Sequence, residues 1–562
     1  MKHLFTVILS AALSTGFILF AQAQTQTVGT FLNTELAYDG YTLIDPMGTE
    51  STYLINNCGE LIQSWQSQYN SGGACYLLND GSLVRGCRVN GNFVGGGVGG
   101  ILERRSWEGD LLWTLTWAND ERHHHHDFAW MPNGHVLVLA WEWKDANEAA
   151  AAGRLNPQTI WPESITEIAP TFPSGGNVVW EWHAWDHLVQ NASPDLPNYG
   201  EPADFPHRIN INHAEVGSGA GGGPGGASSG DWMHANAVNY NPELDQIAIS
   251  SRRFNEIWII DHGTSTEEAA GPGGDLLYRY GNPEAYGRGA EVDRTLFGQH
   301  DVQWVPLGHP QAGDLLVFNN GNERPGCPCS TIDCWTPPLL EDGTYALDDN
   351  APFGPTSSSW SYPESPFEDF FSTNISGVQP QPNGNFLICE GDEGKLFEVT
   401  QSGQTVWEYV NPSGQFGVVQ QGDFPLGNAV FRAYRYGPEF PGFEGRDMTP
   451  GAPLEGNTAF PCTLYPEEDS TSTSAWLQSQ EQTLALSVYP NPASEQVTLL
   501  SNRSGIWSVQ NALGQCIATQ QVSPNQTHEL PCHGLPSGIY VATWMDKEVD
   551  VAPKTLKFFI RH

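Results

Sequence analysis

Three histidine-containing turns recur along the chain, each a short and similar distance ahead of an apolar strand pattern. They are His125-His126-Asp127, Met233-His234-Ala235-Asn236 and Gln299-His300-Asp301. Imidazole can act as a nucleophile, a general acid or base, a metal ligand or a hydrogen-bond donor to an anion. Because a repeated unit with a histidine at the same point in successive copies directs these side chains to a common centre, we expect His126, His234 and His300 to meet in one site.

An arginine and an amide accompany these histidines. Arg252 comes after His234 in the sequence and is separated from it by one predicted strand. Asn236 lies two residues after His234, so on a strand the side chains of His234 and Asn236 point to the same face. A guanidinium would repel a divalent cation, whereas arginine and protonated histidine donate strong hydrogen bonds to sulfonate oxygens. The set therefore favours a site for a tetrahedral oxyanion, in which one histidine, held neutral, could attack sulfur and carry the group covalently.

The run from His123 to His126 also fits a metal site, but adjacent residues on a strand point to opposite faces. We therefore predict no metal. Either His125 or His126 could face the centre; His126 is favoured, and His125 remains a candidate substrate contact. Trp182 belongs to an aromatic run that could pack in a loop or stack on a phenolic ring, which makes it a candidate binding residue.

Composition excludes several kinds of partner. The 562 residues include 64 acidic and 24 basic side chains, for a formal net charge of −40. Such a charge disfavours nucleic acid and anionic membrane surfaces as partners. Only 16% of residues are charged, while 61 Gly and 40 Pro are present. This profile predicts an all-β protein of short strands and many turns.

The N-terminus predicts export. Lys2 and His3 precede an apolar run from Leu4 to Phe20, and Ala21-Gln22-Ala23 forms a cleavage site. We assign residues 1–23 to a signal peptide, because the run is short for a membrane span, and no other stretch could cross a membrane. The ten cysteines of an exported chain can form disulfides, whose pairing the sequence does not give.

From about residue 38, a pattern of apolar strands separated by Asn-Gly and Gly-X turns recurs in six copies. A unit of this length cannot bury both faces alone, so the copies must stack on one another. We predict a six-bladed β-propeller over residues 24–465, with an array of β-sandwiches as the alternative. The histidine turns would then lie at the central channel.

A different composition follows the repeats. Residues 466–484 are rich in Ser, Thr, Glu and Gln and read as a linker. Residues 485–562 contain YPNPAS and LPSGIY and resemble the C-terminal sorting domain of type IX secretion cargo. The resemblance implies a small β-sandwich, recognition by the type IX secretion machinery, and export through the periplasm to a secreted or cell-surface location.

The repeat portion resembles the bacterial arylsulfate sulfotransferase family. The matching stretches include HHDFAWMPNGHVLVLAWEWK, MHANAVNYNPELDQIAISSRRFNEIWIID and FGQHDVQW. The resemblance implies a six-bladed propeller that moves a sulfuryl group from a phenolic sulfate ester to a phenolic acceptor, without the nucleotide donor PAPS and without a cofactor. It implies that His300 is transiently sulfurylated and that the group is held by His126, His234, Asn236 and Arg252. A late threonine of the family would correspond to Thr373 or Ser376.

Two other functions remain as alternatives. A non-enzymatic surface propeller could bind sulfated or phenolic ligands and would not need His300 as a nucleophile. A metal-dependent propeller lyase or hydrolase could use the histidine run. Loss of activity in a chelator would distinguish the metal-dependent enzyme from sulfuryl transfer.

Overall fold

The computed structural model describes residues 25–216, 230–365, 367–456 and 460–465, together with most of a second unit between residues 486 and 560. The predicted signal peptide and the predicted linker lie outside the described residues. Most of the first part is built from six antiparallel sheets of four or five strands. The fold is therefore all-β, as the composition predicted.

We call these sheets blades 1 to 6 and give their strands from the innermost to the outermost. Blade 1 contains β29 (Val430–Tyr436), β2 (Tyr41–Pro46), β3 (Ser51–Asn56) and β4 (Leu61–Gln66). Blade 2 contains β5 (Ser71–Leu77), β6 (Leu83–Arg88), β7 (Gly100–Arg105) and β8 (Leu111–Thr116). Blade 3 contains β9 (Arg122–Trp130), β10 (Val136–Glu142), β11 (Glu163–Pro170) and β12 (Gly176–His183).

The other three blades follow the same pattern. Blade 4 contains β15 (Ala235–Asn241), β16 (Gln246–Ser251), β17 (Glu256–Asp261) and β18 (Tyr278–Tyr280). Blade 5 contains β19 (His300–Trp304), β20 (Leu315–Asn319), β21 (Thr331–Trp335) and β22 (Trp360–Tyr362). Blade 6 contains β23 (Gly377–Pro380), β24 (Phe386–Glu390), β25 (Lys395–Val399), β26 (Thr405–Val410) and β1 (Gly29–Asn33).

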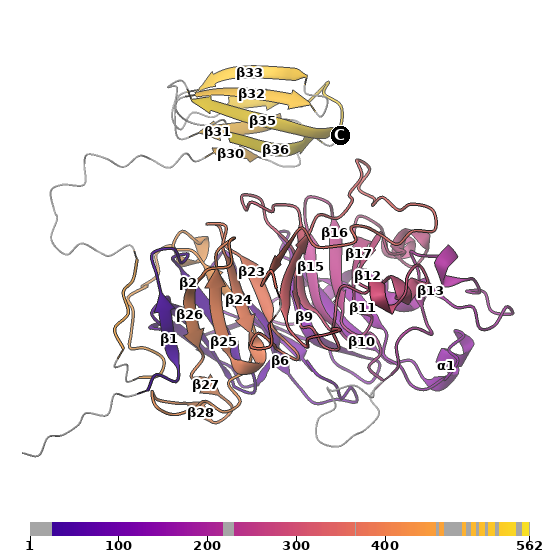
Figure 1. Cartoon of the computed structure of the whole chain (residues 1–562), viewed down its shortest axis with the longest axis horizontal. Coiled ribbons are helices and arrows are strands. Elements are labelled where there is room, and N and C mark those ends of the chain that lie inside the picture. Colours follow the sequence, from indigo (N-terminus) through magenta and orange to yellow (C-terminus); the bar gives the residue numbers. More distant parts are fainter. Residues whose placement is uncertain are drawn as a thin grey trace, which may run out of the picture.

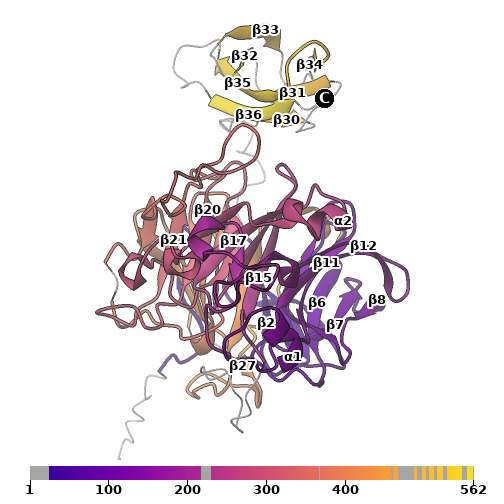
Figure 2. The ribbon, with the colours of Figure 1, turned by 90° about the vertical axis from the view of Figure 1, so that its right-hand side faces the viewer.

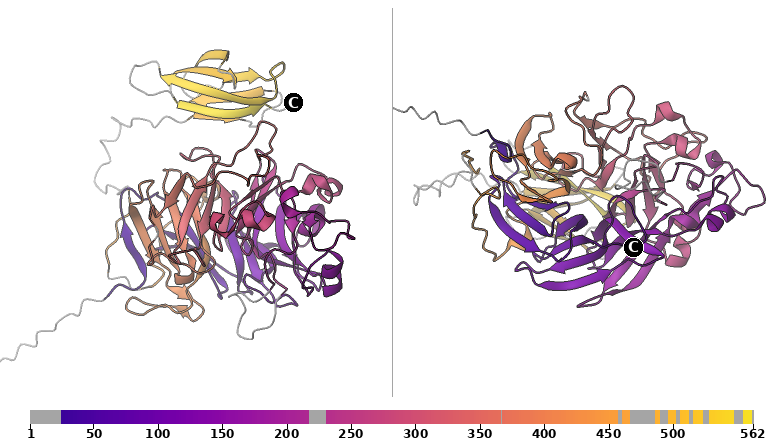
Figure 3. Two further views of the ribbon diagram at one scale, coloured as in Figure 1. Left: turned by 45° about the vertical axis from the view of Figure 1, so that its right-hand side comes forward. Right: turned by 90° about the horizontal axis from the view of Figure 1, so that it is seen from below.

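The six innermost strands contact one another in a closed ring. The contacts run from β29 to β5, then through β9, β15, β19 and β23, and back to β29. Figures 1 and 2 show the blades side by side around this ring, and Figure 3 shows the same arrangement from two further directions. The chain thus forms the predicted six-bladed β-propeller.

Segments far apart in the sequence close the ring. The innermost strand of blade 1, β29, pairs antiparallel with β2, and β1 adds a fifth strand to blade 6 by pairing with β26. A disulfide joins Cys58 to Cys462 over 404 positions of sequence. Blades 1 and 6 are therefore each completed by residues from both ends of the propeller sequence.

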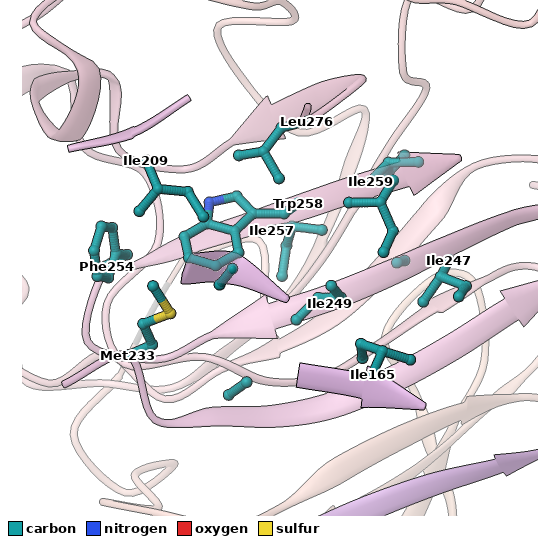
Figure 4. Close-up of a cluster of buried hydrophobic side chains, with 14 of the residues drawn as sticks. Ile165, Ile209, Met233, Ile247, Ile249, Phe254, Ile257, Trp258, Ile259 and Leu276 are labelled. Carbon is teal, nitrogen blue, oxygen red and sulfur yellow. The ribbon is translucent and has the colours of Figure 1, made fainter. Parts of the chain in front are cut away.

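The blades are held together by cores between their faces. In blade 4, Ile257, Trp258 and Ile259 are fully buried on both sides of β17, because neighbouring blades cover both faces of the sheet. Figure 4 shows Trp258 among Met233, Ile249 and Phe254 of the same blade. Burial of one such side chain stabilises the fold by about 1.5–3 kcal/mol. This core fixes the segment that precedes β15, which carries His234.

Shorter elements decorate the blades. These are α1 (Ala146–Ala151), α2 (Thr266–Ala269), β13 (Leu188–Val189), β14 (Ile209–Asn210), β27 (Ser413–Gly414), β28 (Gly417–Val418), and the 3-10 helices η1 (Ala184–His187), η2 (Pro202–Asp204), η3 (Pro272–Gly274), η4 (Pro283–Tyr286), η5 (Glu291–Asp293), η6 (Gly391–Glu393) and η7 (Pro441–Phe443). None of the helices among the described residues has the length and apolar character needed to span a membrane.

The second unit contains two antiparallel sheets (Figure 1, yellow). One consists of β30 (Leu486–Tyr489), β31 (Gln496–Ser501) and β34 (His528–Pro531), and the other of β33 (Cys516–Val522), β32 (Gly505–Asn511), β35 (Gly538–Asp546) and β36 (Lys554–Ile560). Buried Val497, Trp507 and Trp544 belong to one shared core. The unit is therefore a small β-sandwich, as the sequence predicted.

Candidate active site

The three predicted histidines lie where the innermost strands of blades 3, 4 and 5 begin or bulge. The pairing register shifts beside His126 in β9, just after His234 in β15 and just after His300 in β19. The backbone is left-handed at His126 (φ 54°), His234 (φ 51°) and Asp301 (φ 59°). Non-glycine residues adopt this conformation at a cost of about 1–3 kcal/mol, and such strain is concentrated at functional sites.

The hydrogen-bonding partner of His300 fixes which ring nitrogen carries the hydrogen. Nδ1 of His300 lies 2.7 Å from Oδ1 of Asn320. The amide of Asn320 is held in this orientation because its Nδ2 donates to the backbone oxygens of Ser372 and Ile375. Since Oδ1 can only accept, Nδ1 of His300 carries the hydrogen and Nε2 keeps its lone pair.

His300 is buried, with 1% of its surface exposed. Burial first, and then the nearby guanidinium of Arg252, holds the pKa of His300 well below its ordinary value. The ring is therefore neutral near pH 7. Its Nε2 has no hydrogen-bond partner among the described residues, so His300 presents an unprotonated nitrogen that can act as a nucleophile.

His234 is held in the same way by a carboxylate. Its Nδ1 lies 2.5 Å from Oδ2 of Asp231. Burial acts to raise the pKa of Asp231, but the ion pair and hydrogen bond with His234 outweigh it and lower that pKa to about 2. The Asp231 carboxylate accepts the hydrogen on Nδ1, so it can stabilise a positive charge on the His234 ring. Nε2 of His234 has no partner among the residues that the structure describes.

His126, rather than His125, lies beside His234. The centres of the His126 and His234 rings are 4.7 Å apart. His125 lies behind them: its ring stacks on Trp141 at 3.9 Å, its Nε2 lies 2.8 Å from Oε2 of Glu163, and its Nδ1 lies 2.8 Å from Nδ1 of His126. The structure therefore places His126 in the cluster and His125 one layer deeper.

Arg252 contributes a positive charge to the cluster. Its backbone nitrogen donates to the oxygen of His234. Burial first, and then the adjacent Arg253, lowers the pKa of Arg252. Among the described residues its guanidinium has no ion pair or hydrogen bond, whereas Arg253 pairs with Asp231. A guanidinium near His300 that has no partner among the described residues is suited to binding an anion.

The other sequence-predicted residues occupy different positions. Asn236 is buried and donates through Nδ2 to the backbone oxygen of Gln299, so it supports the backbone next to His300. Thr373 is exposed and bonds to Asp392. The hydroxyl of Ser376 donates to Ser372. Trp182 lies on β12, the outermost strand of blade 3, where its Nε1 donates to Gly274. The structure does not bring Trp182 to the cluster.

A glycine-rich segment covers one side of the histidines. The backbone nitrogen of His126 donates to the oxygen of Gly97, and that of Gly99 donates to the oxygen of His124. A Cβ atom at Gly97 would overlap the ring of His126, and one at Gly99 would overlap the ring of His124. We call residues 95–100 the glycine strap. Only glycine allows this backbone to lie so close to the rings.

An arginine of β29, the strand that closes the ring, contacts residues of blades 3, 4 and 5. Arg432 of β29 lies 2.7 Å from Oδ2 of Asp127 and 3.2 Å from Oδ1 of Asp301, and it donates to the backbone oxygen of Asn236. Burial raises the pKa of Asp301 to about 6, although Arg432 acts to lower it. Beyond these residues lies a cavity of about 340 Å³ whose lining includes Tyr76, Tyr240 and Tyr434.

Several residues that build this site carried no signal in the sequence. Asn320, Asp231 and Glu163 each bond to one of the histidines in the run or in the turns, yet they are ordinary polar residues without a repeated spacing. Their proximity to a histidine is visible only in the fold. Among the described residues, no group of three or more His, Cys, Asp or Glu side chains is arranged to hold a metal ion.

Comparison with known families gives two matches. Residues 115–421 match the family described as Arylsulfotransferase (ASST), a stretch that includes His126, His234, Arg252 and His300. Residues 487–557 match the secretion system C-terminal sorting domain, the address of type IX secretion, which indicates export to the cell surface or the extracellular space. No curated protein matches the chain.

Solved structures with a similar shape are distant. A Bacteroides caccae protein of unknown function has 12% identity and a TM-score of 0.38, covering 71% of this chain and 99% of its own. Virginiamycin B lyase from Staphylococcus aureus has 10% identity and a TM-score of 0.31, covering 69% and 89%. The periplasmic gluconolactonase of Pseudomonas aeruginosa has 10% identity and a TM-score of 0.31, covering 88% and 99%.

Proposed function

Because the chain belongs to the arylsulfotransferase (ASST) family, we propose that it transfers a sulfuryl group from a phenolic sulfate ester to a phenolic acceptor through sulfurylated His300, without PAPS. The observation that carries this proposal is the fixed hydrogen position on His300. Asn320 keeps the hydrogen on Nδ1, and burial keeps the ring neutral, so that Nε2 is free to attack sulfur.

Arg252, His126 and His234 would stabilise the transferring group. A sulfuryl group spreads negative charge over three oxygens, and the unpaired guanidinium of Arg252 can donate two parallel hydrogen bonds to them. His234, backed by the Asp231 carboxylate, can donate a further one from Nε2. In a site this buried, one such donor contributes about 3–4 kcal/mol, or 10²- to 10³-fold in rate.

The reaction would follow a ping-pong route. The ester binds beside His300, Nε2 attacks sulfur, and the phenol leaves with its oxygen. An acceptor phenol then takes the sulfuryl group from His300. Asn236 and Arg432 contribute by fixing the backbone around the nucleophile, since Asn236 holds Gln299 and Arg432 holds Asn236.

Turnover of 4-nitrophenyl sulfate by the purified protein, with and without phenol and in the presence of a chelator, tests this function. We expect phenol-dependent release of nitrophenol that persists in chelator, and a sulfuryl adduct on His300 that mass spectrometry detects when donor alone is added. His300→Ala should abolish both signals. The matched control is His533→Ala, an exposed histidine of the second unit.

Two outcomes would favour the alternatives. Activity that disappears in chelator would indicate a metal-dependent lyase or hydrolase. Binding of aryl sulfates without any release would indicate a surface propeller that binds sulfated or phenolic ligands.

A further inference from the structure

Two buried residues that the proposed mechanism leaves unused, His125 and Glu163, form a hydrogen-bonded chain that ends at His126. Oε2 of Glu163 lies 2.8 Å from Nε2 of His125, and Nδ1 of His125 lies 2.8 Å from Nδ1 of His126. The side chains of His125 and Glu163 are fully buried. The chain thus connects a carboxyl group in the core to Nε2 of His126, which has no partner among the described residues.

The hydrogen-bonded series Glu163–His125–His126 has two states that differ only in the positions of its hydrogens. When Glu163 is protonated, it donates to His125, His125 donates to Nδ1 of His126, and Nε2 of His126 carries a hydrogen. When Glu163 is ionised, each hydrogen has moved by one position and Nε2 of His126 has a lone pair. Both rings stay neutral in both states, so a proton can move along the chain without placing a positive charge on either ring.

Packing and a backbone hydrogen bond hold the side chains of His125 and Glu163 in place. The ring of His125 is stacked on Trp141 with an angle of 11° between the planes. The second oxygen of Glu163, Oε1, accepts from the backbone nitrogen of Ala235 at 2.8 Å. Burial raises the pKa of Glu163 well above that of an ordinary carboxyl group, and burial lowers the pKa of both His125 and His126. Burial therefore favours the protonated form of Glu163, from which a proton can pass to His125.

Other charged and titratable groups surround the chain. They are His123, His124 and Asp127 of β9, Glu142 of β10, Asp231 and His234 before β15, His300 of β19 and Arg432 of β29. Within the described residues, none of their side chains hydrogen-bonds to His125 or Glu163. The path for a proton therefore leads from Glu163 only through His125 to His126.

We propose that Glu163 and His125 are a proton relay that supplies, through His126, the proton taken up by the phenol oxygen as it leaves sulfur. The inference rests on the proposed sulfuryl transfer and adds the source of its proton. Both residues act through His126 and do not touch the substrate, so they are positioning residues.

In the first half-reaction the sulfuryl group passes from the ester to His300. The lone pair on Nε2 of His300 forms a bond to sulfur, and the ester sulfur–oxygen bond breaks with its electron pair on the phenol oxygen. That oxygen takes the proton from Nε2 of His126, and one hydrogen moves from His125 to His126 and one from Glu163 to His125. Glu163 ends as a carboxylate.

The second half-reaction returns the proton. The hydroxyl of the acceptor phenol gives its proton to Nε2 of His126, and the same hydrogens move back until Glu163 is protonated. The acceptor oxygen forms the new bond to sulfur, and the electron pair of the nitrogen–sulfur bond returns to Nε2 of His300.

The Glu163→Gln variant tests the relay with esters of two leaving groups. Glutamine can accept from Ala235 and donate to His125, so it preserves both hydrogen bonds but cannot release a proton. With phenyl sulfate, whose phenolate is a strong base, we expect kcat/KM to fall about 10²-fold. With 4-nitrophenyl sulfate, whose phenolate is a much weaker base, we expect a fall below about 5-fold.

The matched control is Glu181→Gln on β12, a partly exposed carboxylate that pairs with Arg122. It should leave both esters unaffected. A second measurement does not depend on the folding of a variant: the wild-type protein should show a larger solvent deuterium isotope effect with phenyl sulfate than with 4-nitrophenyl sulfate.

The outcomes separate the relay from the sulfuryl transfer. Equal losses for both esters in Glu163→Gln, or equal isotope effects in the wild type, would overturn the relay while the sulfuryl adduct on His300 still forms. Absence of that adduct in the wild type would overturn the sulfuryl transfer itself, and the relay with it.

Discussion

Asn320 decides which nitrogen of His300 carries the hydrogen. The geometry resembles that of an acid–base triad, in which a buried polar group selects one imidazole tautomer and the opposite nitrogen does the chemistry. The unusual feature is that a neutral amide takes this role, itself fixed by two backbone carbonyls. The hydrogen bond to this amide acts to raise the pKa of His300, but a neutral partner raises it less than a carboxylate would, which suits the proposed role of His300 as an unprotonated nucleophile.

Replacement of Asn320 by alanine should therefore lower kcat for 4-nitrophenyl sulfate by about 10²- to 10⁴-fold, because the hydrogen can then move to Nε2. KM should change little. Steady-state kinetics would measure this. Asn322→Ala is the control, since Asn322 donates to the exposed Thr373. An unchanged kcat in Asn320→Ala would contradict the role given to the amide.

Replacement of Arg252 should raise the pH below which the sulfuryl adduct on His300 no longer forms. The Arg252 guanidinium is the second cause, after burial, of the lowered pKa of His300. Arg252→Gln removes a positive charge that disfavours the imidazolium, so the pKa of His300 should rise. We expect adduct formation in the variant to be lost at a higher pH than in the wild type. Loss of adduct formation at the same pH would show that Arg252 is not close to His300.

The histidines could be predicted from the sequence, whereas their partners could not. His126, His234 and His300 stand at equivalent points of repeated units, which is a pattern within the sequence. Asn320 directly follows β20 of blade 5, and its distance from His300 depends on how β19 and β20 pair. Trp182 was a candidate because of its residue type alone. It lies far from the centre because β12 is the fourth and outermost strand of blade 3.

At the scale of elements, the glycine strap determines how closely the backbone approaches the rings. Gly97 has a left-handed backbone (φ 70°), and its Cα lies against the ring face of His126. A side chain there would displace His126 from its contact with His234. The strap therefore contributes to the site without any functional group of its own.

Gly97→Ala should lower activity about 10-fold or more while the protein still folds, because a displacement of about 1 Å in a site can cost up to 10²-fold. The matched control is Gly109→Ala, which has a similar backbone (φ 93°) but open space around the added methyl group. Gly97→Ala should also lose more stability in thermal unfolding than Gly109→Ala, because only its methyl group overlaps a buried ring. Equal activities would show that the strap does not position His126.

A polar contact between blades 3 and 4 should make stability depend on pH. His262 bonds to Asp245 at 2.7 Å and to Glu167 at 3.2 Å, and Glu167 also bonds to His135. Burial lowers the pKa of His262, but these hydrogen bonds outweigh burial and raise it to about 9. A pKa raised on folding stabilises the protein below the unfolded value of about 6.5 and loses this effect as pH rises through about 9.

The temperature of unfolding should therefore fall between about pH 6.5 and pH 9, and His262→Gln should flatten this part of the curve. The contact is partly exposed to solvent, so we expect it to contribute about 1 kcal/mol. Calorimetry over the pH range would measure both effects. If the unfolding temperature falls equally with pH in the wild type and in His262→Gln, groups other than His262 cause the pH dependence.

The sequence pattern found three strands of most blades and missed the innermost one. The apolar runs correspond to β10, β16, β20 and β24, which lie second in their blades. The innermost strands, such as β9 with its histidines and Asp127, are interrupted by polar residues and bulges, so their alternation is broken. The strands that carry the site are thus the least regular ones in sequence.

At the scale of the whole molecule, Arg432 connects the closing strand to blades 3 and 5. Its removal would leave Asp127 and Asp301 buried without their cation. The pairing of β29 with β2 joins residues nearly 400 positions apart, so no local pattern could have placed this arginine at the centre.

Arg432→Met should destabilise the protein by about 3–5 kcal/mol, the usual cost of breaking a buried ion pair. The loss should be larger at pH 8 than at pH 5, because burial raises the pKa of Asp301 to about 6 and a protonated Asp301 no longer needs the cation. Denaturant unfolding at both pH values would measure it. Arg446→Met, which removes an exposed pair with Glu108, should change stability by less than about 1 kcal/mol.

The pairing of β29 with β2 also determines when the ring of blades is complete. During synthesis, the segments that carry His126, His234 and His300 emerge long before β29, and until β29 pairs with β2 the channel has a gap where Arg432 belongs. A chain that is still crossing a membrane therefore holds these histidines in an incomplete ring. The proposed sulfuryl transfer would begin only after translocation of the propeller is complete, away from phenols inside the cell.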